Sequence, residues 1–157
     1  MPTAERTVEI SASPEIVWNM VADPSLIPKL FPDVVSAVFD PPGPAAVGTK
    51  LNMTAKIAGR RVQQSFELTE VAQGKKLAIK QLPGGLFKTY LGAFMIEPSK
   101  KGTRITQSVE YVVSAGYLGK VLSALVVNRT VRKNILVSLT NLKELAELKE
   151  LPGKTAG

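Results

Sequence analysis

The sequence of 157 residues contains neither cysteine nor histidine. Without cysteine, disulfide bonds, thiolate nucleophiles and thiolate zinc sites are excluded. Without histidine, the usual general base near neutral pH is missing, as are Ser-His-Asp triads and most transition-metal sites. Long apolar runs are also lacking, because the longest, Val121 to Val127, is interrupted by Ser123 and too short to cross a bilayer. We therefore expect no cofactor and rank binding above catalysis.

The charge of the sequence is unevenly distributed. The formal net charge is +7, yet residues 1–40 contain two basic and six acidic residues, whereas the remainder contains 18 basic and seven acidic residues. A basic surface attracts anionic lipid, nucleic acid or acidic proteins, but a solvated exterior is the simpler interpretation. We expect no specific nucleic-acid binding. The short polar segment 2–6 predicts no export signal, so the expected location is the cytoplasm.

The N-terminal segment combines a strand, a capped helix start and a helix stop. Val8 and Ile10 alternate with polar residues, as in a strand with one buried face. Ser13 suits the cap of a helix, because its hydroxyl can accept from the first free amides, and Pro14 suits the first helical position. An apolar stripe follows Pro14, and it ends at Pro24. The segment therefore predicts a strand and a short helix.

A second short helix is expected over residues 24–31, and an alternating region follows it. Ala58-Gly59 suits a two-residue hairpin loop. This loop would place Leu51 opposite Phe66, Met53 opposite Gln64 and Ala55 opposite Val62, with all apolar members on one face. Together with the first strand, the predicted strands number seven and cover residues 34–39, 51–57, 61–68, 77–81, 90–96 and 105–113.

From about residue 117 to Leu151 the apolar spacing becomes helical. The expected stripe comprises Leu118, Val121, Leu122, Leu125 and Val126, followed by Val131, Ile135, Leu139, Leu142 and Leu145. A kink or a break near Asn128 remains open. Pro152-Gly153 predicts the helix end, so residues 1–152 would form a single domain with a tail over residues 153–157.

This order of elements predicts an α+β fold. An antiparallel sheet of six or seven strands has one apolar face, and the long helix has one apolar stripe, so the two should cover each other. When such a sheet is strongly curved, space remains between it and the helix. That space suits an elongated apolar ligand.

Several short motifs resemble those of the Bet v 1-like, or START, superfamily. They are Ser13-Pro14-Glu15-Ile16-Val17-Trp18, Asp23-Pro24, Phe31-Pro32, Val47-Gly48-Thr49, Gly102-Thr103-Arg104 and Leu118-Gly119. The sequence resembles most the polyketide cyclase/dehydrase and lipid-transport branch, with the coenzyme Q-binding proteins and a group of carbon monoxide dehydrogenase subunits as neighbours. The resemblance implies a helix-grip fold with a hydrophobic cavity. It does not decide the function, because carriers, cyclases and hydrolases share this fold.

Alternation along the strands places several polar side chains on the apolar face. A buried amide or phenol without a partner costs roughly 1–3 kcal/mol, so each should be paired, hydrated or in contact with a ligand. This pattern suits a lipid, quinone or polyketide that carries hydroxyl or carbonyl groups. The alternative is an error in strand register, or glutamines at exposed sheet ends. The candidate ligand-binding residues are Met53, Gln64, Phe66, Gln81, Tyr90, Phe94, Gln107, Tyr111, Leu122 and Leu125.

Three functions remain open. The first is a carrier or sensor of a hydrophobic small molecule. The second is a cyclase or dehydratase that uses Tyr90 or Tyr111, although a phenol of pKa near 10 needs a partner for acid-base work and none is evident; no catalytic residue is assigned. The third is a maturation or assembly partner of a larger complex. Arg129, Arg132 and Lys133 would serve that contact or a weak one with an anionic membrane, unless they form a solvated helix face.

Overall fold

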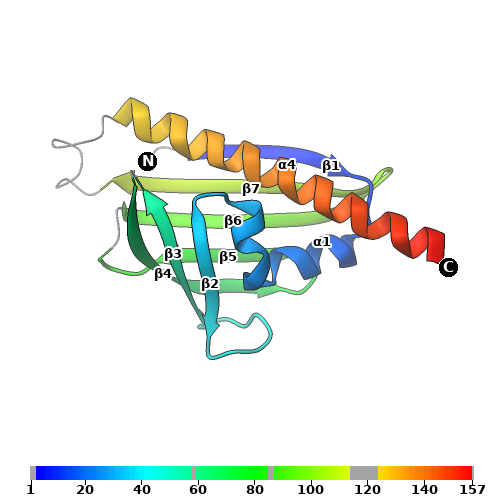
Figure 1. Ribbon diagram of the computed structural model, residues 1–157, viewed down its shortest axis with the longest axis horizontal. Coiled ribbons are helices and arrows are strands. Elements are labelled where there is room, and N and C mark those ends of the chain that lie inside the picture. The colour runs from blue at the N-terminus through cyan, green and yellow to red at the C-terminus, as the bar shows by residue number, and fades with distance from the viewer. Residues whose placement is uncertain (1–2, 58, 85–86, 114–123, 157) are drawn as a thin grey trace.

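Seven antiparallel strands form one curved sheet in the order β1-β7-β6-β5-β4-β3-β2 (Figure 1). The computed structural model describes residues 3–57, 59–84, 87–113 and 124–156. The first strand of the chain pairs with the last, which confirms a seven-stranded antiparallel sheet. The strands are β1 (Thr3–Ile10), β2 (Val34–Asp40), β3 (Lys50–Ile57), β4 (Arg60–Ala72), β5 (Lys76–Gln81), β6 (Phe87–Ser99) and β7 (Gly102–Val113).

The β3–β4 hairpin has the register that the sequence predicts. Leu51 lies opposite Phe66, and Met53 lies opposite Gln64. Phe66 in turn lies opposite Gln81 of β5. Because residues paired across a sheet share a face, these side chains all point to the same side.

The two short helical segments after β1 are also confirmed. Helix α1 (Pro14–Val21) begins at Ser13, whose Oγ accepts from the amide of Ile16 at 3.3 Å. A 3-10 turn, η1 (Pro24–Leu26), begins at Asp23 and leads into α2 (Ile27–Leu30). Both α1 and α2 pack against the long C-terminal helix, and Figure 1 shows α1 beside the C-terminal half of that helix.

The long helix, α4 (Ala124–Ala156), differs from the prediction in its stripe and its end. It is continuous at Asn128, and it continues past Pro152 to Ala156, so the helix end predicted at Pro152-Gly153 was wrong. Leu125 and Val126 are 60% and 44% exposed, so their place in the apolar stripe was wrong. The periodicity that starts at Val131 extends back four residues to Val127 instead. The buried stripe comprises Val127, Val131, Ile135, Leu139, Leu142 and Ala146.

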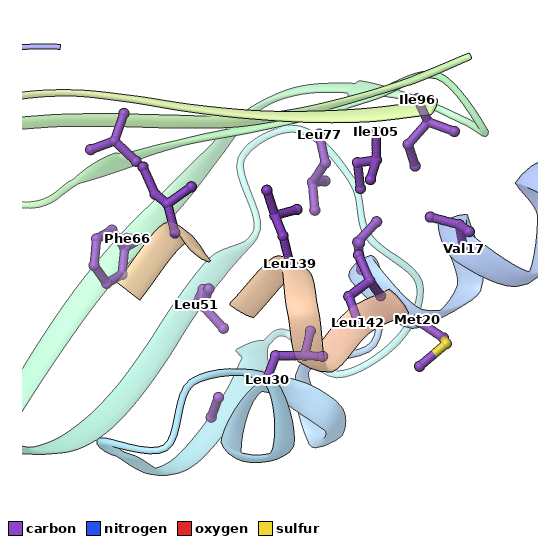
Figure 2. Packing of buried hydrophobic residues seen from close by; sticks show 14 of the residues in the cluster. Val17, Met20, Leu30, Leu51, Phe66, Leu77, Ile96, Ile105, Leu139 and Leu142 are labelled. Carbon is purple, nitrogen blue, oxygen red and sulfur yellow. The ribbon is translucent and has the colours of Figure 1, made fainter. Parts of the chain in front are cut away.

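The centre of the core lies between the sheet and the middle of α4. Figure 2 shows Leu139 and Leu142 between the sheet residues Leu77 and Ile105 on one side and Leu30 of α2 on the other. Among the helices in the described part of the chain, none combines the length and the apolar character needed to span a membrane.

Polar contacts hold the end of β1 and the segment after it in place. The buried Thr103 hydroxyl donates to the carbonyl of Ala12 at 2.7 Å. The amide of Ser11 donates to Glu147 Oε2 of α4 at 2.8 Å, and Lys143 Nζ donates to the same oxygen at 2.7 Å. Hydrogen bonding to Lys143 and Ser11 lowers the pKa of Glu147. These contacts fix the C-terminal half of α4 relative to the sheet.

Candidate ligand-binding site

The inward face of the sheet is densely packed at one end and half-buried at the other. Leu68, Ile96 and Ile105 are buried at the end covered by α1 and the C-terminal half of α4. Farther along the strands, Gln64 and Tyr90 face the same side but stay half-buried. The second region is therefore where the described part of the inward face retains accessible surface.

Four aromatic rings from three strands meet in this region, and we refer to them as the aromatic cluster: Phe66, Phe87, Tyr90 and Tyr111. The ring of Tyr90 lies 5.6 Å from that of Phe66 and 5.1 Å from that of Phe87, between centroids. Phe87 and Tyr111 are 5.7 Å apart in an edge-to-face arrangement. Such geometry is favourable for aromatic pairs. The cluster forms a rigid apolar wall.

Gly92 makes room for one ring of this cluster. A Cβ atom at Gly92 would lie 3.2 Å from Cε1 of Tyr90 and 3.4 Å from Cγ1 of Ile79. Both contacts are tight, so a larger residue would displace the ring. The glycine therefore lets Tyr90 lie along the inward face of β6.

Two of the candidate polar residues are paired with α4. Gln107 Oε1 accepts from Ser138 Oγ at 2.9 Å in a buried contact. The Tyr111 hydroxyl donates to Asn128 Oδ1. These pairs join β7 to the helix, so Gln107 and Tyr111 have structural partners in the protein itself.

Gln81 is different, because both polar atoms of its side chain are buried without any hydrogen-bond partner among the described residues. It lies at the end of β5, opposite Phe66 of the aromatic cluster. An unsatisfied buried amide costs roughly 1–3 kcal/mol for each group. A native fold that retains such a group requires an explanation, and a hydrogen bond to a bound molecule is one.

The remaining candidates divide into those on this face and those away from it. Met53 and Phe94 are half-buried and pack against the core. Phe94 lies opposite Leu77 and Gln107, which places it on the same face. Leu122 lies outside the described residues, and Leu125 is exposed on α4, apart from the rest. The structure thus brings eight candidates to one face: Met53, Gln64, Phe66, Gln81, Tyr90, Phe94, Gln107 and Tyr111.

Phe87, Asn128 and Ser138 also belong to this region, although the sequence pattern did not predict them. Strict alternation back from Tyr90 places Phe87 on the outer face, but a bulge between Phe87 and Thr89 returns it to the inner one. Asn128 and Ser138 are polar residues at positions of the buried stripe, three before Val131 and seven after it. That helical spacing was the signal in the sequence that could have placed both residues on the buried side of the helix.

Both tyrosines are neutral near pH 7. Burial raises the pKa of Tyr90 from its ordinary value of 10 to about 12. Burial also raises the pKa of Tyr111, and the positive charge of Arg132 partly opposes this. Tyr90 has no hydrogen-bond partner within the described residues, so its hydroxyl is available as a donor to a bound molecule.

Tyr90 is expected to make the protein sensitive to alkali. Between pH 10 and pH 12 the unfolded chain loses this phenolic proton while the folded protein keeps it, so stability present below pH 10 is lost as the pH rises. The loss is about 1.4 kcal/mol per pH unit. Urea unfolding at about pH 9 and about pH 11 measures how much the free energy of unfolding falls between the two pH values, and this fall is compared between the unmodified protein and Tyr90→Phe. Identical pH dependence of the two proteins would show that Tyr90 is not buried in this way.

Comparisons with known proteins identify the family and the fold. The sequence profile described as polyketide cyclase/dehydrase and lipid transport matches residues 1–147. No curated protein matches the sequence. The protein is similar in structure to TTHA0849 from Thermus thermophilus, with 23% identity over 91% of this chain and 95% of that one, at a TM-score of 0.74.

Two further structures show the same fold. The Zhui aromatase/cyclase from Streptomyces sp. R1128 is 18% identical over 93% of each chain, with a TM-score of 0.78. Ara h 8.0201 is 16% identical over 92% of this chain and 97% of that one, with a TM-score of 0.69. The curved sheet and its long helix thus form the helix-grip fold of the Bet v 1-like superfamily, and the match over residues 1–147 shows that the chain belongs to the polyketide cyclase/dehydrase and lipid transport family.

Proposed function

We propose that the protein binds a hydrophobic small molecule with a hydroxyl or carbonyl group between the inward face of the sheet and α4. The observation that carries this proposal is the amide of Gln81, which is buried opposite Phe66 without a hydrogen-bond partner among the described residues. A ligand oxygen would accept from its nitrogen, and a ligand hydroxyl would donate to its oxygen. Binding would require a local rearrangement that opens the surroundings of this amide.

The neighbouring side chains define the class of ligand. The aromatic cluster offers flat apolar walls, and Tyr90 adds one neutral donor. The inward positions Met53 and Phe94 supply further apolar surface, and the methionine side chain adapts to varied shapes. A site with apolar walls and a few uncharged polar groups suits a lipid, quinone or polyketide.

Binding without turnover is favoured over catalysis by the chemistry of the inward face. The inward candidates include no carboxylate, and Tyr90 is a very weak acid that stays protonated near pH 7 because its pKa is about 12. A cyclase or dehydratase remains the second candidate. The observation in its favour is Tyr111, which has Asn128 as acceptor and the charge of Arg132 nearby. Under that function, Tyr111→Phe would abolish turnover of a polyketide substrate and preserve the fold.

A displacement assay with the fluorescent probe N-phenyl-1-naphthylamine tests the binding proposal. Met53→Trp should weaken probe binding at least about tenfold, because the larger ring fills space on the inward face. Gln64→Trp, on the opposing strand, should do the same. The matched control is Leu91→Trp, since Leu91 is 43% exposed on the outer face of β6. That variant should bind the probe normally.

The outcomes distinguish binding at the inward face from nonspecific binding of the probe. Circular dichroism must first show that all three variants are folded. If both inward variants then bind the probe as well as Leu91→Trp does, the site lies elsewhere and the proposal fails. Displacement of the probe by a fatty alcohol, a quinone or an aromatic polyketide would rank the three ligand classes. A cytoplasmic location and a role in the assembly of a larger complex stay predictions from the sequence.

A further inference from the structure

A groove of about 370 Å³ lies between β1 and α4, and none of the four rings of the aromatic cluster lines it. Its apolar lining includes Ala4 and Ile135, and Leu136 contributes to its rim. Arg6 of β1 lies on one side, and Arg132 and Lys133 of α4 lie on the other. Figure 1 shows the two elements lying along each other, and their backbones are in contact. The groove is thus lined by both apolar and basic side chains.

The cations of this groove have no ionic partners among the described residues. The ion pairs between described residues involve Lys76, Lys80, Arg104 and Lys143, and none of these four residues lines the groove. Glu5 is the one acidic residue that lines the groove, and it forms no salt bridge there. Along α4 the first acidic residue is Glu144. Three cations against one carboxylate leave the lining of the groove with a net positive charge.

Exposed leucines lie in line with these cations. Leu125, Arg129, Arg132 and Leu136 follow one another at intervals of four, three and four residues, which places them on one side of a helix. Leu125 is 60% exposed and Leu136 is 43% exposed. We call Leu125, Arg129, Arg132, Lys133 and Leu136 the basic flank of α4.

We propose that the basic flank docks on an anionic phospholipid bilayer, with a lipid phosphate in the groove beside Arg6. Cations interspersed with exposed leucines are characteristic of helices that lie in the membrane interface, where the cations meet headgroups and the leucines enter the acyl boundary. The phosphates of a nucleic acid would pair with the cations, but its backbone offers no apolar surface to the leucines. This inference goes beyond ligand binding and does not depend on it.

Sedimentation with vesicles tests the proposal on the full-length protein. Vesicles of phosphatidylcholine alone are compared with vesicles that contain about one-third phosphatidylserine. The protein should sediment with the anionic vesicles, and raised salt should weaken the association. The triple variant Arg129→Glu, Arg132→Glu, Lys133→Glu should lose at least about tenfold in affinity. Leu125→Ser with Leu136→Ser should weaken binding even at low salt, because the apolar contribution is removed.

The matched control reverses three exposed lysines at the opposite end of the sheet: Lys75→Glu, Lys100→Glu, Lys101→Glu. This variant has the same net charge as the triple variant of the basic flank and should retain vesicle binding. If both triple variants lost vesicle affinity equally, the effect would come from net charge alone and the proposal would be overturned. So would an absence of binding to anionic vesicles at low salt, or selective binding of an acidic protein in their place. Probe binding by N-phenyl-1-naphthylamine should be unchanged in the variant with both Leu125→Ser and Leu136→Ser, so failure of docking and failure of ligand binding are distinguishable.

Discussion

Gly102→Ala is expected to lower the free energy of unfolding by about 3–5 kcal/mol, a large part of the stability of a small domain. Gly102 has a φ of +138°, which is strained for any residue with a Cβ atom. A Cβ there would also lie 2.5 Å from the carbonyl oxygen of Ala12. That carbonyl accepts from the buried Thr103 hydroxyl, so relief of the clash would disturb the hydrogen bond as well.

Gly43→Ala is the matched control for this substitution. Gly43 has a nearly equal φ of +133°, but a Cβ there would meet nothing within 4 Å. It should therefore cost only the backbone strain, roughly 1–2 kcal/mol. Denaturant unfolding of both variants measures the difference. If the two substitutions cost the same, the packing of Ala12 against the β6–β7 turn is not as described.

Gln81→Leu is expected to separate stability from binding. Removing the amide should raise the free energy of unfolding by about 1–3 kcal/mol, because a buried group that has no partner in the described part of the chain is replaced by an apolar one. The same change should weaken binding of a carbonyl-bearing ligand by about tenfold. Menadione and 2-methylnaphthalene share a ring skeleton and differ in the two carbonyl groups, so their affinities should converge in this variant.

Gln64→Leu serves as the control, since Gln64 faces the same side but its polar atoms are not among those buried without a partner. It should be stabilised less than Gln81→Leu and should retain the preference for menadione. If Gln81→Leu is destabilised, its amide has a partner and the argument for a ligand at this position fails. If it is stabilised but still prefers menadione, the ligand oxygen binds elsewhere.

Local rules predict the sheet well where pairing and turn geometry agree. The Ala58-Gly59 loop and the alternation on both sides of it give the same register, and the structure has that register. Alternation fails at Phe87, because a bulge adds a residue that no local pattern reveals. The candidate site is correspondingly recovered over regular strands and missed beside the bulge.

The long helix shows a different limit of sequence reasoning. Its stripe is correct from Val131 to Leu142, where α4 lies on the packed core, whereas the predicted Leu145 is only partly buried and its neighbour Ala146 is buried. Leu125 is apolar and fits a helical spacing, yet it is exposed, because hydrophobicity alone does not tell which face a sheet covers. The partners Asn128 and Ser138 depend on tertiary contacts with β7, which the helix sequence does not contain.

Occupancy of the inward face is the central claim, and ligand-to-protein nuclear Overhauser effects test it most directly. The protein is isotopically labelled and a tight-binding quinone or lipid from the displacement assay is left unlabelled. We expect contacts from the ligand to the methyl group of Met53 and to the rings of Phe66 and Tyr90, with a changed side-chain amide signal of Gln81. Contacts confined to the outer face, such as to Leu91, would contradict the claim.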